Sequence, residues 1–230
     1  MKTTKLNVLI MLLILAAGFS SCAKTDRLIE ENELYVKVEN ASEFSNVAEV
    51  KLMMYDASNN RWIELAQSDW KDGGFIIELP ETISSNYLHA LDINGFLINI
   101  ATPPTITVSN KNVKVRTPLF CGFDKDGKEV AYFRPSAIDE NGNAKDVFFT
   151  YVDSDVNISG YTKAEGHAIP ACPDCPSWFK QTTTYSIKWK KGWNVWWTSS
   201  DYTVAGYTLI ETRQWSTAPV SELKWYGSEN

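Results

Sequence analysis

Histidine is scarce in this chain of 230 residues, which contains only His89 and His167. The sequence also has no Gly-x-Ser-x-Gly nucleophile elbow, no glycine-rich phosphate loop and no His-x-x-x-His zinc helix. Acidic residues are abundant, so a pair of carboxylates could still act as in a glycosidase, because only their separation in space decides that. We nevertheless predict a protein that is not an enzyme and that holds no metal or cofactor.

Positive charge is also in short supply. The chain has 22 Lys and Arg against 28 Asp and Glu, a formal net charge of −6. Residues 1–21 contain two lysines and no acid, so the chain without them has 20 basic and 28 acidic residues and a net charge of −8. Binding to nucleic acid or to anionic lipid depends on a basic surface. The charge balance therefore argues against both kinds of partner.

No apolar run in the chain approaches the roughly 20 residues that span a bilayer. The longest, residues 8–17, follows Lys2 and Lys5 and is followed by four residues of the sequence Gly-Phe-Ser-Ser and then Cys22. A positive start, a short apolar stretch and small residues before a cut are typical of a secretory signal. Residues 1–21 are therefore predicted to be a signal peptide.

The small residues that precede Cys22 resemble the end of a bacterial lipoprotein signal. That resemblance implies cleavage just before Cys22, acyl chains on Cys22 and attachment to the outer membrane, with the periplasmic or exterior side left open. Residues 22–33 are polar and lack strand alternation, so they are predicted to be a flexible tether. An ordinary secreted protein with a free Cys22 is the alternative.

Cysteine is limited to four residues, and two of them form a Cys-x-x-Cys pair. Cys172 and Cys175 lie between Pro170 and Pro176, so they are placed in a loop. Outside the cytoplasm this spacing favours a small disulfide loop. A zinc site and a redox centre are the alternatives, although the spacing supplies one ligand pair instead of two and no helix-forming segment follows. Cys121 is predicted to be a small buried hydrophobe.

Helical periodicity is nearly absent, and short alternating runs bounded by Gly, Pro, Asn and Asp occur instead. This pattern predicts an all-β fold of the sandwich or barrel kind. Residues 34–118 are predicted to form a sandwich-like domain and residues 119–230 an aromatic-rich antiparallel β domain, although the two halves could share one core. The predicted strands are 34–39, 47–55, 61–66, 74–79, 96–101, 105–108, 113–120, 129–134, 147–152, 185–190, 193–198, 207–215 and 222–226.

Seven of the nine tryptophans lie between residues 178 and 225. Residues 185–190 and 193–198 are predicted to form a hairpin that turns at Lys191 and Gly192. Alternation places Trp196 on the face opposite Trp193 and Trp197, so Trp196 is a candidate platform for stacking on a ligand. Trp178 is a second candidate. The alternative for Trp196 is that both sheet faces are covered and that it belongs to the core.

Three motifs occur in order in the last third: residues 148–160 (FFTYVDSDVNISG), residues 185–194 (YSIKWKKGWN) and residues 223–226 (LKWY). Together they resemble a group of Bacteroidetes cell-envelope lipoproteins, in which a Lys-Lys-Gly-Trp-Asn hairpin precedes a terminal Lys-Trp-Tyr strand. Residues 38–80, which end in GGFIIELP, are similar to transthyretin-like or carboxypeptidase-regulatory-like sandwich modules. The first resemblance implies a location in the cell envelope and little about activity.

These observations favour a lipid-anchored envelope protein that binds or adheres without catalysis, with a glycan or a protein as ligand. A structural subunit of an envelope or fimbria-like assembly, joined through an edge strand, is the alternative. An enzyme that uses unrecognised carboxylates is a third hypothesis.

Overall fold

A computed structural model describes residues 29–30, 32–56, 59–92, 105–138, 144–167, 176–217 and 223–229. Within them the chain is all-β, as predicted, with strands β1 to β16 and two short 3-10 helices, η1 (Ala41–Phe44) and η2 (Ser85–Tyr87). None of the described helices is long and apolar enough to cross a membrane. The predicted strand at 96–101 lies outside the described residues.

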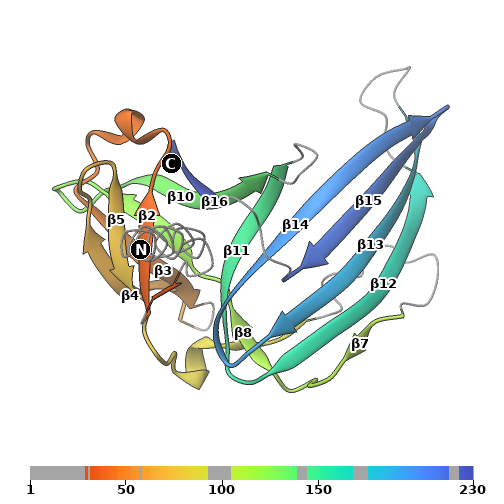
Figure 1. The fold of residues 1–230 in the computed structure, drawn as a ribbon, viewed down its shortest axis with the longest axis horizontal. Coiled ribbons are helices and arrows are strands. Elements are labelled where there is room, and N and C mark those ends of the chain that lie inside the picture. Colours follow the sequence, from red (N-terminus) through yellow and green to blue (C-terminus); the bar gives the residue numbers. More distant parts are fainter. Residues whose placement is uncertain are drawn as a thin grey trace, which may run out of the picture.

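The strands form a small sheet and a large one (Figure 1). The small sheet has the order β1 (Ile29–Glu30), β2 (Glu33–Lys37) and β5 (Gly74–Glu78). The large sheet has thirteen strands. They are β3 (Glu49–Asp56), β4 (Arg61–Asp69), β6 (His89–Ala90), β7 (Thr107–Val108), β8 (Lys114–Arg116), β9 (Leu119–Phe123), β10 (Glu129–Ile138), β11 (Ala144–Val152), β12 (Val156–His167), β13 (Trp178–Trp189), β14 (Gly192–Ala205), β15 (Thr208–Ser216) and β16 (Leu223–Glu229).

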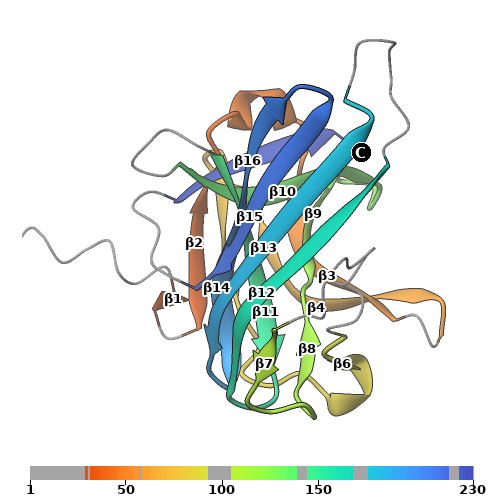
Figure 2. The same ribbon diagram turned by 90° about the vertical axis from the view of Figure 1, so that its right-hand side faces the viewer.

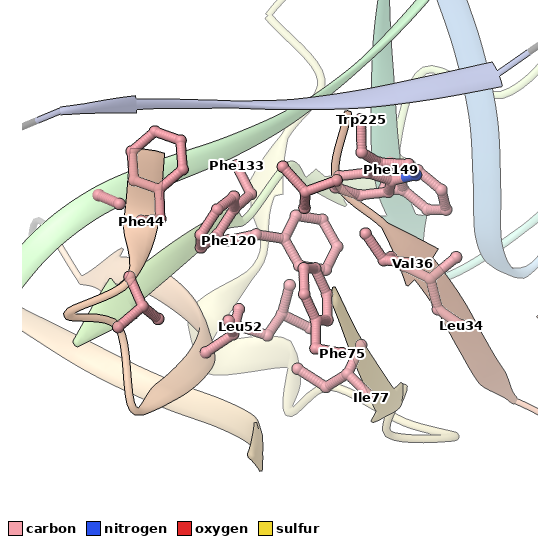
Figure 3. Close-up of a cluster of buried hydrophobic side chains, with 14 of the residues drawn as sticks. Leu34, Val36, Phe44, Leu52, Phe75, Ile77, Phe120, Phe133, Phe149 and Trp225 are labelled. Atoms are coloured by element: carbon pink, nitrogen blue, oxygen red, sulfur yellow. The ribbon is translucent and has the colours of Figure 1, made fainter. Parts of the chain in front are cut away.

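The small sheet packs against the first strands of the large sheet and encloses the largest core (Figure 3). In β2 and β5, alternate residues such as Leu34 and Phe75 point into this core, while Tyr35 and Ile76 point to solvent. The Phe133 ring lies deep in the core and stacks on Trp70 at a centroid distance of 4.9 Å. Burying a side chain of this size stabilises the fold by roughly 1.5–3 kcal/mol.

This core draws on both sides of the predicted boundary between residues 118 and 119. Strand β3, from the first half, pairs with β9, from the second. Trp225 of β16 lies in the same core, with its ring edge-on to Phe120 at 5.0 Å. Strand β10 pairs with β9, β11 and β16, and in Figure 1 it crosses with β16 from the side of β2 and β5 toward β11. The two predicted halves are therefore joined by one continuous sheet.

Beyond β10, the large sheet continues into β11, β14, β15, β13 and β12, which we call the wing (Figure 2). The predicted turn near Lys191 is present: Asn194 Oδ1 accepts the backbone N–H of Lys190, and Asn194 Nδ2 donates to its carbonyl oxygen. The predicted pairing of the two strands flanking this turn is wrong, because β15 lies between β13 and β14.

Strand β15 enters between them from the far end of the wing. It follows β14 through a tight turn at Gly206, where φ is +59°, and pairs with β14 over nine residues. It then runs parallel to β13 over nine residues, so the sheet is mixed and not purely antiparallel. In this order both edges of β15 are paired over nine residues, with β14 on one side and β13 on the other.

Candidate functional site

Trp196, the first predicted ligand platform, is only 9% exposed and belongs to a second core on one face of the wing. Its indole stacks on Phe148 at 4.6 Å and lies 5.1 Å from the ring of Trp215. Its Nε1 donates to Thr150 Oγ1 at 2.8 Å. The prediction that Trp196 is available to a ligand is therefore wrong, because side chains cover this face of the sheet as well as the other.

Trp178, the second predicted platform, is half-buried at the start of β13, at the far end of the wing. Its ring is edge-on to its cross-strand partner His167, with a centroid distance of 4.4 Å. Its backbone N–H donates to the carbonyl oxygen of Tyr207, in the β14–β15 turn. Cys172 and Cys175, which lie between β12 and β13 along the chain, and Cys22 lie outside the described residues.

Cys121 is buried and free, with its side chain near Glu129. Burial and that carboxylate raise the pKa of the thiol to about 12. The thiol is therefore protonated at neutral pH and chemically unreactive. Among the described residues, no group of three or more potential metal ligands comes together.

Four strands of the wing present a continuous face on which cross-strand partners form four rows. Each row runs from β12 through β13 and β15 to β14. The first row is Gly166, Phe179, Leu209 and Val204; the second is Ala164, Gln181, Glu211 and Tyr202; the third is Thr162, Thr183, Arg213 and Ser200; the fourth is Gly160, Tyr185, Trp215 and Thr198. Paired residues share a side of a sheet, so these side chains are neighbours.

The centre of this face is a polar group made of Gln181, Tyr202, Glu211 and Arg213, which we call the wing cluster. Gln181 Nε2 donates to Glu211 Oε2 at 2.6 Å, and Arg213 Nε donates to Glu211 Oε1. The Tyr202 hydroxyl lies close to both the Glu211 carboxylate and the Arg213 guanidinium. One carboxylate therefore binds two side chains and has Tyr202 of a third strand beside it.

Exposure rises steeply across the wing cluster. The side chain of Glu211 is 12% exposed and that of Arg213 is 43% exposed. Tyr202 is 61% exposed, so its ring lies on the surface although its hydroxyl is beside the ion pair. The cluster thus has a partly buried ionic base and an aromatic ring that is open to solvent.

Electrostatics keep the Glu211 carboxylate charged. Burial alone would raise its pKa, but the hydrogen bonds from Arg213, Gln181 and Tyr202 outweigh this effect and lower the pKa of Glu211. The hydrogen bond to Glu211 in turn raises the pKa of Arg213. Both groups are therefore ionised at neutral pH, and Glu211 is unsuited to act as a general acid.

Catalysis of the glycosidase type needs a second carboxyl group about 5–9.5 Å from the first. Glu211 is the only carboxylate in the four described rows, and alternation along β14 directs Asp201 to the opposite face. This face therefore does not supply the carboxylate pair that the sequence left open.

The surroundings of the wing cluster combine hydroxyl groups with apolar side chains. The Tyr185 hydroxyl lies near the hydroxyls of Thr162 and Thr183 in the next row, and the Tyr185 ring lies 5.5 Å from that of Trp215. In the first row, on the side of the wing cluster away from Tyr185, the side chain of Val204 is exposed. Such a surface, with fixed donors and acceptors around an exposed ring, suits a ligand that has both hydroxyl groups and an apolar ring face.

Sequence reasoning missed the residues of the wing cluster. Glu211 and Arg213 alternate with Trp215 in the predicted strand 207–215, which places them on one face. Tyr202 lies beyond the predicted strand 193–198, and Gln181 lies in a polar stretch without alternation, so no sequence pattern indicated either residue.

No protein-family model, no curated protein and no solved structure matches the chain.

Proposed function

We propose that this chain is an outer-membrane lipoprotein, anchored through acyl chains on Cys22, that binds a glycan at the wing cluster without catalysis. The anchor is supported by the charged start, the ten-residue apolar run and the small residues before Cys22. Several acyl chains on one residue would hold the protein permanently at the membrane, since each buried methylene contributes about 0.8 kcal/mol.

The observation that carries the binding proposal is the exposure of the Tyr202 ring beside the Glu211–Arg213 ion pair. An aromatic ring at the surface offers a flat apolar face on which a sugar ring can stack. The Tyr202 hydroxyl lies beside the Glu211–Arg213 ion pair, so a sugar stacked on the ring would have charged groups next to it that can bind its hydroxyls. Gln181 and Arg213 lie beside it and offer further hydrogen-bond donors.

A glycan fits this surface better than a protein partner does. A stable protein interface buries about 800 Å² per partner around a mostly apolar centre. Here the centre is polar, and the hydrophobic side chains Val204 and Leu209 are confined to its border. Directed hydrogen bonds around a single exposed ring are what a polyhydroxylated ligand needs.

The test is a panel of bacterial, plant and host polysaccharides bound to a surface and probed with the full chain purified in detergent. We expect at least one polysaccharide to retain the wild-type protein, and Tyr202→Ala to lose most of this binding. Tyr35→Ala is the matched control, because Tyr35 is 55% exposed and its hydroxyl is likewise beside a carboxylate, Glu33 Oε2 at 2.5 Å, but it lies on the small sheet.

Near-ultraviolet circular dichroism and the melting temperature would verify that both variants are folded. Retention of no polysaccharide at all, or equal retention of wild type and folded Tyr202→Ala, would contradict the proposed binding site. The anchor has its own test: mass spectrometry of the membrane-extracted protein should find acyl chains on an N-terminal Cys22, and an unmodified start would contradict it.

A further inference from the structure

We infer that the glycan bound at the wing cluster carries a carboxylate, as in a uronic acid, and that Arg213 is the residue that selects it. This inference rests on the proposed function. It follows from the charge that the cluster turns toward solvent and from the shape of the Arg213 guanidinium.

The exposed charge of the cluster is positive. Both oxygens of Glu211 already accept hydrogen bonds, Oε1 from Arg213 and Oε2 from Gln181, and its side chain is only 12% exposed. The side chain of Arg213 is exposed more than three times as much. An approaching ligand therefore meets the guanidinium before the carboxylate, even though the ion pair as a whole is neutral.

The described bond from Arg213 to Glu211 uses Nε, which lies at one edge of the planar guanidinium. The two Nη groups form a fork that matches the two oxygens of a carboxylate. Arg213 lies one row from Tyr202, a step of two strand residues or roughly 7 Å. A sugar ring stacked on Tyr202 would therefore bring a carboxylate on that ring within reach of the fork.

Long-range electrostatic attraction cannot supply the preference for an acidic sugar, because the chain as a whole is acidic, with a net charge of −6. The lysines of the same strands, Lys163, Lys180 and Lys188, occupy positions that alternate to the opposite face of the wing. Recognition of an acidic sugar would thus depend on Arg213 locally, and it should weaken as salt rises because the guanidinium is partly exposed.

The experiment compares one ligand in two forms: oligogalacturonate, and the same oligosaccharide after reduction of its carboxyl groups to primary alcohols. Affinities are measured by titration with the full chain in detergent. We expect wild type to bind the acidic form about tenfold or more tightly than the reduced form, as for one charge-assisted hydrogen-bonded contact. Arg213→Lys, which retains a cation beside Glu211, should remove most of this preference because a lysine has no planar fork.

Lys180→Gln, on the opposite face, is the control and should retain the preference. Equal binding of the two forms by wild type, with loss in Tyr202→Ala, would overturn the inference and leave glycan binding intact. Failure of both forms to bind would overturn both proposals for this ligand class. Equal displacement by a short polyglutamate peptide would show that an acidic protein segment is the partner, which would overturn the inference as well.

Discussion

The side chain of Asn40 pairs with the backbone of Gly227, 187 residues further along the chain. Asn40 Nδ2 donates to the carbonyl oxygen of Gly227 at 3.0 Å, and Asn40 Oδ1 accepts the Gly227 N–H at 2.9 Å. The carboxamide therefore takes the place of a neighbouring strand at the edge of β16. Next to it, the backbone N–H of Glu39 donates to the carbonyl oxygen of Trp225 at 2.8 Å, so the last strand is tied to the first part of the chain.

Removal of the Asn40 carboxamide should loosen the last strand. Asn40→Ala leaves the partly buried N–H and C=O of Gly227 without these partners, and we expect a loss of about 1–3 kcal/mol in the free energy of unfolding. Urea denaturation followed by tryptophan fluorescence measures this. Asn40→Asp retains the acceptor but not the donor and should lie between wild type and Asn40→Ala. A change below about 0.3 kcal/mol in both variants would contradict the account.

The same strand depends on the absence of a side chain at Gly227. A Cβ built there would overlap the ring of Phe44, which is buried against Phe133 at a centroid distance of 5.6 Å. Gly227→Ala should therefore destabilise the fold by about 1–3 kcal/mol. Combining it with Phe44→Leu should recover part of this loss, and a double-mutant cycle measures the coupling. Strict additivity of the two changes would show that the ring and residue 227 do not compete for space.

The strands with regular alternation could be predicted from the sequence, whereas those without it could not. In β3, Val50, Leu52 and Met54 are buried as their spacing predicts. The first half of β13 contains Gln181 and three threonines in succession, which offer no apolar face, and it was not predicted. That stretch is a strand because β12 and β15 flank it on both edges and satisfy its backbone.

The candidate site needed the strand order, which the turn at Lys191 does not encode. Alternation alone places Glu211 and Arg213 on one face. It cannot bring Gln181 and Tyr202 to them, because that requires β15 to lie between β13 and β14. Likewise, the choice between core and platform for Trp196 depended on whether Phe148 and Trp215 cover it, which is a property of the folded sheet.

Truncation to alanine should cost much more stability at Trp196 than at Tyr202. Trp196→Ala removes a buried ring and the bond to Thr150, and we expect a loss of roughly 3–5 kcal/mol in stability. Tyr202→Ala removes a mostly exposed ring and should change stability by about 0.5 kcal/mol or less. Urea denaturation of both variants tests the comparison. A small loss of stability for Trp196→Ala would contradict the burial of Trp196 and support the prediction that it is a surface platform.

Stability should fall at alkaline pH because of Cys121 and Tyr132, which are cross-strand partners. Burial raises the pKa of Cys121 to about 12, and the hydrogen bond from Tyr132 to Glu129 Oε1, at 2.6 Å, raises that of Tyr132 to about 12. Both pKa values lie above those of the unfolded chain. Their contribution is therefore complete below about pH 8.5 and is lost as pH rises toward 12.

Denaturant midpoints between pH 8 and pH 11.5 measure this dependence. The pH profile of Tyr132→Phe should be flatter than that of wild type, because the phenol no longer titrates. Tyr207→Phe, which alters an exposed tyrosine in the β14–β15 turn, serves as the control and should leave the slope unchanged. Stability that is constant up to pH 11.5, or equal slopes for wild type and Tyr132→Phe, would contradict the assignment.

The most direct test of ligand binding at the wing cluster is hydrogen–deuterium exchange of the full chain with and without a retained polysaccharide. We predict that bound ligand slows exchange in peptides that cover residues 199–213 of β14 and β15, and leaves residues 33–37 and 74–78 of the small sheet unchanged. Protection confined to the small sheet, or no protection on the wing at saturating ligand, would contradict the central claim.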